Sequence, residues 1–367
     1  MKRILYHITI LLIVLSAFTA CKKMDSTYSK FIVPGGLTYP GKISSPLVYA
    51  GHNRVKIAWL RGSDPKVSKA RIFWNNNADS IEVPIPSTGD TISILINDLE
   101  EKSYSFMVRT YDDKGNSSIP VELLGASYGE KYQSLLLSRP INSAIIDDEG
   151  TVTLQWGSAN ITGGAYATDV SYTDNSGSVQ TKRFAISEVS STVSNVKLGA
   201  PLQYRTVYLP DSLSIDTFYT DYANNERYMY NKSAWAVVDY SSQHNTDPAN
   251  VVTNIIDGSP ATRWHTQATT SQYPHFVTID MKSEKTITAF EIFRMLDDER
   301  ACDKFQLLVS KDNDTWTDLG IFNFNRLIND GQLYEIPSYP KARYFKFIGI
   351  SGPNNYMVMG EINVYGL

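Results

Sequence analysis

The feature that most constrains the fold is a succession of short strand-like runs separated by turn residues. The runs are rich in Val, Ile, Thr and Tyr, and turn segments such as NNNAD and DDKGN lie between them. Runs of this kind are typical of antiparallel sandwiches. A second set repeats the order about 100 residues further on, which indicates an internal repeat. We therefore expect an all-β chain; the first runs of the two sets are RVKIAWL and TVTLQWG.

Aromatic positions recur in the two repeats. Trp59 and Trp156 occupy matching places in RVKIAWL and TVTLQWG. Leu99 precedes Tyr104 by five residues and Leu198 precedes Tyr204 by six, a spacing that resembles the start of the sixth strand in fibronectin type III domains. In those domains the tyrosine hydroxyl closes a corner onto nearby backbone. We expect these residues to have structural roles.

The N-terminus has the layout of a secretory signal. Lys2 and Arg3 precede an apolar run that is too short to span a bilayer, and small residues follow it. The ending FTAC resembles the lipobox of bacterial lipoproteins, although Phe18 stands where a leucine is usual. The resemblance implies lipidation at Cys21 and a location at the outer membrane or cell surface, held by a lipid anchor. The alternative is an ordinary signal peptide that is cleaved nearby.

The segment that follows the lipobox carries a second resemblance. With YPGK and DPKVSKARIFWNN, residues 30 to 225 resemble a family of uncharacterised lipoprotein domains from polysaccharide-degrading gut bacteria. The resemblance implies a surface setting and no activity.

Removal of residues 1–20 takes Lys2 and Arg3 away and changes the net charge from −4 to −6. No basic stripe offsets this charge, so a nucleic-acid partner is disfavoured.

The last third of the chain carries the most specific motifs. In order, they are NIIDGSPATRWHTQ, YPHFVTIDM, FEIFR, FQLLVSKDNDTW, RYFKFIGI and GEINVYG. Together they resemble a coagulation-factor type C (discoidin) domain in its bacterial form, the family 32 carbohydrate-binding module. The resemblance implies a jelly-roll sandwich over residues 234–367 and a glycan ligand.

The Asp-Gly turn of the first motif suggests a metal site. A hard cation such as Ca²⁺ takes six to eight oxygen ligands. Asp257, the Thr262 hydroxyl and loop carbonyls supply such oxygens, and the family resemblance implies that Glu361 completes a structural calcium site. An Asx-turn at Asp257 without metal is the alternative.

The family resemblance also suggests ligand-binding residues. It places His265 and Arg294 in contact with the sugar, whereas Trp264 is expected in the core. Several galactose-binding relatives carry a tryptophan three residues after the histidine, where this chain has Ala268, so galactose itself is in doubt. Other side chains then have to supply the aromatic ring and further polar contacts; the candidates are Tyr273, Asn354, Asn355 and Tyr356.

No motif predicts catalysis. The histidines lack the spacing of a zinc site, and carboxylates beside Cys302 disfavour a thiolate nucleophile. We expect a lipid-anchored, non-catalytic surface protein that binds glycans, with surface proteins as possible further partners. A protein-binding adhesin or an outer-membrane assembly subunit is the alternative, and an accessory chain of a hydrolase is a third hypothesis.

The expected parts are a signal peptide (1–20), a tether (21–40), two fibronectin type III-like sandwiches (41–125 and 126–225), a linker (226–233) and a discoidin-like domain (234–367).

Overall fold

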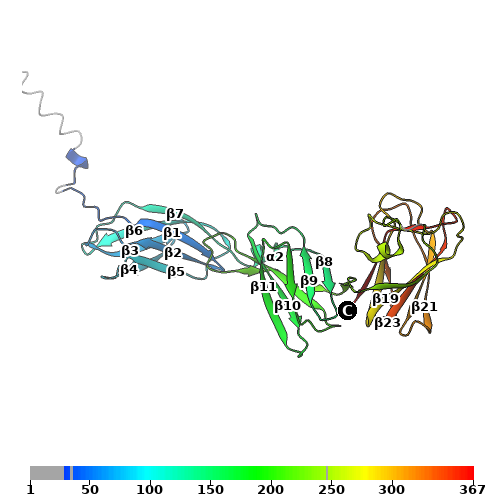
Figure 1. Ribbon diagram of the computed structural model, residues 1–367. Coiled ribbons are helices and arrows are strands. Elements are labelled where there is room, and N and C mark those ends of the chain that lie inside the picture. Colours follow the sequence, from blue (N-terminus) through cyan, green and yellow to red (C-terminus); the bar gives the residue numbers. More distant parts are fainter. Residues whose placement is uncertain (1–28, 34–35, 245–246) are drawn as a thin grey trace, which may run out of the picture. The chain divides into compact units, whose positions relative to one another are not determined.

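The computed structural model describes residues 29–33, 36–244 and 247–367. The expected signal peptide, Cys21 and part of the tether lie outside these residues. The regular secondary structure of the described chain is almost entirely β, which confirms the all-β prediction, and the chain forms two compact units (Figure 1). Among the described residues, no helix combines the length and apolar character needed to cross a membrane.

The first unit contains the described residues up to Gly129 together with Leu213–Asp216. Its strands form one three-stranded and one four-stranded sheet. The first sheet has the order β1 (Ser44–Gly51), β2 (Arg54–Leu60), β5 (Thr91–Ile96), and the second has the order β4 (Asp79–Pro84), β3 (Val67–Trp74), β6 (Lys102–Asp112), β7 (Val121–Ser127).

Alternating apolar side chains of both sheets fill the core of this unit. Trp59 is 2% exposed, and Leu99 and Tyr104 are buried beside it in the same cluster. The Tyr104 hydroxyl donates to the Glu100 carbonyl at 3.1 Å, which closes a corner at the start of β6. The structural roles predicted for Trp59, Leu99 and Tyr104 are confirmed, whereas the fibronectin type III resemblance stays a prediction.

The second unit begins with another sandwich. Its first sheet has the order β11 (Val179–Ala185), β10 (Ala165–Thr173), β13 (Leu202–Tyr208), β14 (Phe218–Tyr219), and β15 (Ala223–Asn225) also pairs with β13. Its second sheet contains β12 (Ser190–Val193), β9 (Val152–Trp156) and β8 (Ile141–Ile146). A short helix, α2 (Glu130–Ser134), precedes these strands.

The aromatic pattern of the first sandwich recurs here in part. Trp156 is buried, its indole donates to the Ser191 hydroxyl at 3.0 Å, and its ring lies 6.0 Å from that of Tyr204. The structural role predicted for Leu198 is wrong, because its side chain is 51% exposed. Leu198 lies in the turn before β13, beside Gly199 with its φ of +85°, and this turn points away from the core.

The segment 226–233, predicted as a linker, is a structured part of the sheets. Tyr228–Tyr230 form β16, which pairs in parallel with β8 and antiparallel with the final strand, β25 (Glu361–Gly366). The Tyr228 and Tyr230 side chains are buried, and their hydroxyls donate to backbone carbonyls. The linker prediction is therefore wrong, since strand pairing fixes this segment within the second unit.

The C-terminal domain is organised around β19 (His275–Phe293). The separate motifs YPHFVTIDM and FEIFR lie largely in this one strand, which bends at an irregularity between Asp280 and Lys285. Its first half pairs with β17 (Ala236–Tyr240) and its second half with β22 (Gln332–Glu335) and β25. The remaining strands are β20 (Lys304–Ser310), β21 (Trp316–Asn323) and β23 (Lys341–Ser351), with the short pair β18 (Trp264–His265) and β24 (Val358–Met359).

Substitution of Tyr228 tests the role of β16. Tyr228→Ala is expected to lower the free energy of unfolding of the second unit by about 3 to 5 kcal/mol, because it leaves a cavity where a fully buried ring lay. Tyr166→Ala is the matched control, since Tyr166 is 50% exposed and should change stability by less than about 0.5 kcal/mol. Urea unfolding of the full chain measures both values, and equal effects of the two substitutions would contradict the assignment.

Candidate functional site

The long loop between β17 and β19, residues 241–274, carries most of the candidate residues. It contains a short 3-10 helix, η3 (Val252–Ile256), and the strand β18, which pairs with β24. Trp264 is fully buried and its indole donates to the Ser242 carbonyl at 3.0 Å, so its predicted core position is confirmed. The pairing with β24 and the bond from Trp264 hold β18 in place, and the position of His265, the next residue, is fixed as a result.

His265 lies between two other rings. Its centroid is 5.0 Å from that of Tyr356, with the planes 13° apart, and 4.8 Å from that of His244. Tyr356 comes from the loop after β23 and His244 from the segment after β17. Three segments that are distant in sequence therefore supply one aromatic stack.

Two ring nitrogens of this stack lack a partner among the described residues. The Nδ1 atom of His265 lies 2.6 Å from the Thr266 carbonyl oxygen, and a neutral imidazole can make this bond only if Nδ1 carries the proton. Nε2 of His265 is then an acceptor, and no described residue bonds to it. Nδ1 of His244 is buried and has no partner in the described chain. Buried polar atoms are normally satisfied, so Nδ1 of His244 is suited to a ligand, and the acceptor Nε2 of His265 lies in the same stack.

Cationic side chains border the stack. The Arg300 guanidinium lies 5.9 Å from the Tyr356 ring and is held by the Asp298 carboxylate through bonds of 2.8 and 2.5 Å. Burial lowers the pKa of His265, and the nearby charges of Arg300 and Arg263 lower it further. His265 is consequently a neutral hydrogen-bonding group near pH 7, which is the form that suits a hydroxyl ligand.

Arg294, the second residue suggested by the family resemblance, makes different contacts. Its side chain is buried, and its guanidinium bonds to the Arg326 carbonyl at 3.2 Å and to the Asn329 amide oxygen at 2.5 Å. Nε of Arg294 is buried without a partner in the described residues. These contacts attach Arg294 to the loop after β21, and none of them involves the histidine–tyrosine stack.

The other ligand candidates lie around the loop that contains Tyr356. The Tyr273 ring packs 4.6 Å from that of His275, and its hydroxyl is buried. His275 Nε2 lies 2.8 Å from the Asn355 carbonyl oxygen, which holds this loop in place. Asn354 is half-buried and Asn355 is exposed. Tyr356 therefore contacts His265 directly, whereas Tyr273 supports the loop from below.

The predicted metal residues come together at the start of the same loop. The Thr262 hydroxyl lies 2.7 Å from both Asp257 Oδ2 and the Ser259 carbonyl oxygen. Glu361, the first residue of β25, accepts a bond of 2.6 Å from the Gly258 backbone N–H. The structure thus brings Asp257, Thr262 and Glu361 to one turn.

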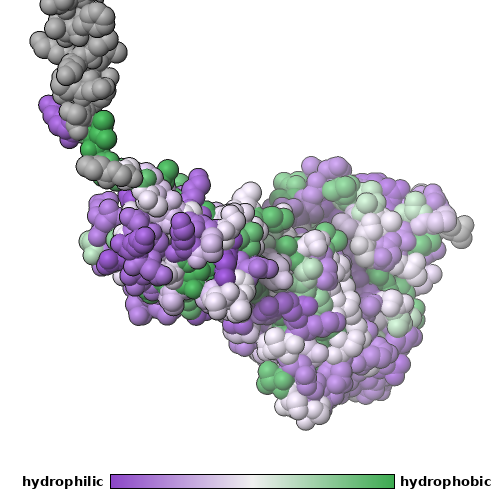
Figure 2. Space-filling model, turned by 90° about the vertical axis from the view of Figure 1, so that its left-hand side faces the viewer, coloured by the Kyte–Doolittle hydropathy of each residue, from purple (hydrophilic) through white to green (hydrophobic). Residues whose placement is uncertain are grey.

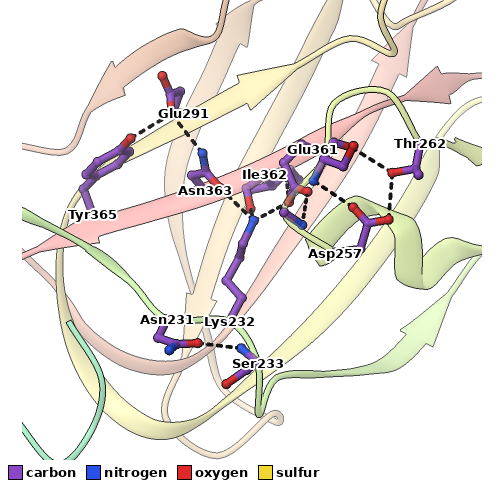
Figure 3. A network of polar contacts seen from close by, with 12 residues as sticks. Asn231, Lys232, Ser233, Asp257, Thr262, Glu291, Glu361, Ile362, Asn363 and Tyr365 are labelled. Carbon is purple, nitrogen blue, oxygen red and sulfur yellow. Dashed lines mark hydrogen bonds and ion pairs between the residues drawn. The ribbon is translucent and has the colours of Figure 1, made fainter. Parts of the chain in front are cut away.

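A lysine from outside the predicted site also contacts this group (Figure 3). The Lys232 ammonium forms an ion pair with Glu361 Oε1 and donates to the Asn363 side chain at 2.7 Å and to the Ile362 carbonyl at 3.2 Å. The side chains of Lys232 and Glu361 are 7% and 1% exposed. Burial raises the pKa of Glu361 to about 7, and the Lys232 ammonium opposes this shift.

These residues fit a calcium ion. Asp257, Thr262 and Ser259 supply a carboxylate, a hydroxyl and a carbonyl within hydrogen-bond distance of one another, and calcium prefers such a set. Lys232 binds Oε1 of Glu361, so Oε2 faces the turn. Among the described residues no cluster of three acidic, histidine or cysteine side chains occurs, so a calcium ion here would need neutral oxygens as ligands as well.

Three residues of the site were missed by sequence reasoning. His244 lies in the polar stretch SSQHNTD, Arg300 lies among carboxylates in DDERACD, and Lys232 lies in the supposed linker. No local pattern distinguishes them from solvated side chains, because pairing between distant strands decides which of them meet.

Comparison with known families agrees with this architecture. Residues 21–218, just over half of the chain, match DUF4998, a domain of unknown function, and residues 234–362 match the F5/8 type C domain. The chain therefore belongs to the DUF4998 family and carries an F5/8 type C (discoidin) domain at its C-terminus. The predicted resemblances to a family of uncharacterised domains and to discoidin domains are confirmed in this sense, whereas the lipoprotein character stays a prediction. The sequence matches no curated protein.

Several solved structures are similar to the C-terminal domain. The C-terminal domain of a chitobiase from Bacteroides fragilis is 21% identical, with 37% of this chain and 95% of that chain covered and a TM-score of 0.35. A family 32 carbohydrate-binding module from C. perfringens, in complex with galactose, is 17% identical, with coverages of 38% and 98% and a TM-score of 0.34. A Clostridium perfringens module in complex with GalNAc-β-1,3-galactose is 20% identical, with coverages of 35% and 94% and a TM-score of 0.33.

The buried ion pair gives a stability prediction. Lys232→Met, measured in a chelator so that no divalent ion replaces the ammonium, leaves the Glu361 carboxylate buried without its partner. The free energy of unfolding is expected to fall by about 3 to 5 kcal/mol in urea unfolding of the full chain. Addition of Glu361→Gln to this variant should recover part of the loss, because the unpaired charge is then removed.

A surface ion pair provides the control. Lys311 is 65% exposed and pairs with Glu284 at 2.8 Å, so Lys311→Met should cost less than about 1 kcal/mol. A loss for Lys232→Met no larger than that for Lys311→Met would show that the buried pair does not stabilise the domain.

Proposed function

We propose that the F5/8 type C domain binds glycans at the face formed by His265, His244, Tyr356 and Arg300. The observation that carries the proposal is the stack of His244, His265 and Tyr356, in which Nδ1 of His244 is buried without a partner and Nε2 of His265 bonds to no described residue. A sugar presents hydroxyl groups that donate to and accept from such atoms, together with apolar C–H faces that pack against aromatic rings.

Each residue has a distinct part in this proposal. Neutral His265 accepts a hydroxyl proton at Nε2, because its Nδ1 is committed to Thr266. The Arg300 fork retains an N–H group beyond the pair that binds Asp298, and this group is available to a ring or hydroxyl oxygen. Tyr356 supplies the aromatic surface. In several galactose-binding relatives a tryptophan has this part, but this chain has Ala268 at that position. Asn354 and Asn355 lie in the same loop and add polar contacts.

In this proposal calcium braces the loop without contacting the sugar. Asp257, Thr262 and Glu361 would hold the ion, which supplies positive charge that stabilises the turn. Asp257 and Thr262 lie on the turn and Glu361 lies on β25, so an ion held by them would connect the turn to the strand, while Lys232 pairs with the other oxygen of Glu361. Through η3 and β18 this bracing sets the position of His265.

The proposal also includes the setting of the protein. Lipidation of Cys21 would anchor the chain at the outer membrane or cell surface, and the two N-terminal sandwiches lie between Cys21 and the glycan-binding domain along the sequence. We propose no catalytic activity. The Cys302 thiol, the one nucleophilic cysteine in the described chain, is fully buried, and burial raises its pKa.

Glycan binding is tested with an array followed by titration of the full chain. The best saccharide should bind wild type, and His265→Ala and Tyr356→Ala should each weaken binding about ten- to hundredfold, the cost of about 1 to 3 kcal/mol for a lost polar or stacking contact. Tyr339→Ala is the control, because Tyr339 is a 54% exposed tyrosine of the same domain without a ring partner in the described chain.

Two further arms make the result decisive. Wild-type affinity in both loop variants would place the site elsewhere, and the absence of any glycan ligand with calcium present would favour the adhesin alternative. Calorimetry with and without chelator tests the metal: calcium should raise the midpoint of the domain by mass action, and Asp257→Ala should abolish the difference.

The lipid anchor is tested at Cys21. Cys21→Ser should release the mature protein from membranes or block its processing, because only the thiol accepts the lipid. Detergent phase partitioning of cells that express each form measures this. Unchanged membrane association of the serine variant would contradict the lipoprotein hypothesis.

A further inference from the structure

A cavity of about 460 Å³ opens at one end of the first sandwich. Strands β2 and β4 end there, and β1, β3 and β5 begin there, so the loops that follow β2 and β4 form its rim. Its volume lies in the range of small-molecule sites. The cavity belongs to the first unit alone and takes no part in the glycan site proposed above.

Apolar groups from both sheets form the floor of this cavity. Trp59 in β2 and Ile92 in β5 are cross-strand partners, and both side chains are at most 5% exposed. Ile43 lies beside them from the segment before β1. The floor is therefore rigid and apolar, and a compact ring or hydrocarbon group can pack against it.

The polar rim is dominated by Arg61. Its guanidinium donates to the Ser87 carbonyl at 2.8 Å and to the Pro86 carbonyl, so it fixes the loop after β4. Its Nε is buried and has no partner among the described residues. An unsatisfied buried N–H group is costly unless an acceptor binds it, so this atom points to a missing acceptor.

The charges around the cavity favour an anion. Lys42 lines it and forms no ion pair or hydrogen bond within the described residues. Asp64 also lines it, but its two carboxylate oxygens accept the backbone N–H groups of Gly41 and Lys66 at 2.8 and 3.0 Å. Those two bonds hold the pKa of Asp64 below its usual range. Of the three charged side chains, the two cations are thus open to a ligand.

From these features we infer that the cavity binds a small organic carboxylate of about monosaccharide size. The carboxylate accepts from Arg61 Nε and pairs with the Lys42 ammonium, while the ring or apolar body of the ligand packs on Trp59 and Ile92. A guanidinium binds a carboxylate through charge-assisted hydrogen bonds, so the neutral analogue of the same ligand binds much more weakly. Figure 2 shows the face of the first unit at which the chain enters, where hydrophilic and hydrophobic residues are interspersed.

The experiment compares acids with neutral analogues on the full chain. D-glucuronate and benzoate are titrated beside D-glucose and benzamide, and binding is followed by saturation-transfer NMR and calorimetry. At least one acid should bind saturably and about tenfold or more tighter than its neutral counterpart. Lys42→Gln should weaken this binding about three- to tenfold and Arg61→Gln more than tenfold. Lys66→Gln should leave it unchanged, because Lys66 is exposed on the same loop and does not line the cavity.

Lys42→Gln keeps the test decisive if Arg61→Gln disturbs the loop after β4. Lys42 has no protein partner in the described chain, so its substitution should leave the thermal midpoint of the first unit unchanged. The inference is overturned if neither acid binds, if acid and neutral analogue bind equally, or if Lys42→Gln binds like wild type. None of these outcomes depends on glycan binding by the C-terminal domain.

Discussion

The Lys232–Glu361 pair holds together the parts of the chain from which the proposed glycan face is built. Glu361 opens the last strand and also accepts the backbone N–H of Gly258, whereas Lys232 follows directly after β16. Two charges that are almost fully buried need both their mutual attraction and further hydrogen bonds to offset desolvation. The ammonium and carboxylate have these additional partners, which are backbone carbonyl, amide oxygen and backbone N–H. The pair therefore fixes the Asp257 turn relative to the sheet. The position of this turn determines where the following loop residues, including His265, lie.

Much of the fold follows from local sequence signals, and the exceptions depend on distant pairing. Alternating runs and turn residues predicted the sandwiches, and Trp59, Tyr104, Trp156 and Trp264 lie in cores as their motifs indicated. The segment 226–233 resembles a linker because it is short and polar at both ends. It is nevertheless a strand, since β8 and β25 provide hydrogen-bonding edges on its two sides. Likewise, the separate motifs YPHFVTIDM and FEIFR lie largely in one bent strand, because β23 pairs with residues on both sides of the bend.

The residues of the candidate site also differ in whether local sequence signals could predict them. His265 and Tyr356 were candidates from motif and residue type, and the structure stacks them. Arg294 was a candidate from the same resemblance, yet its guanidinium holds the loop at Asn329. His244 and Arg300 have no recognisable local context, and only the folding of the loop onto β24 brings them to the stack. Residue type thus suggests what can bind, whereas strand pairing and loop anchoring decide what meets.

The central claim is that His265 and its ring neighbours contact the sugar. Its most direct test is an imidazole ¹H–¹⁵N correlation spectrum of the full chain, titrated with the best saccharide from the array. The ring nitrogens of His265 and His244 should shift together and saturate, with His265 remaining the Nδ1-protonated tautomer, while His52 in the first unit stays unchanged. A saccharide that binds to saturation without moving the His265 resonances would contradict the claim.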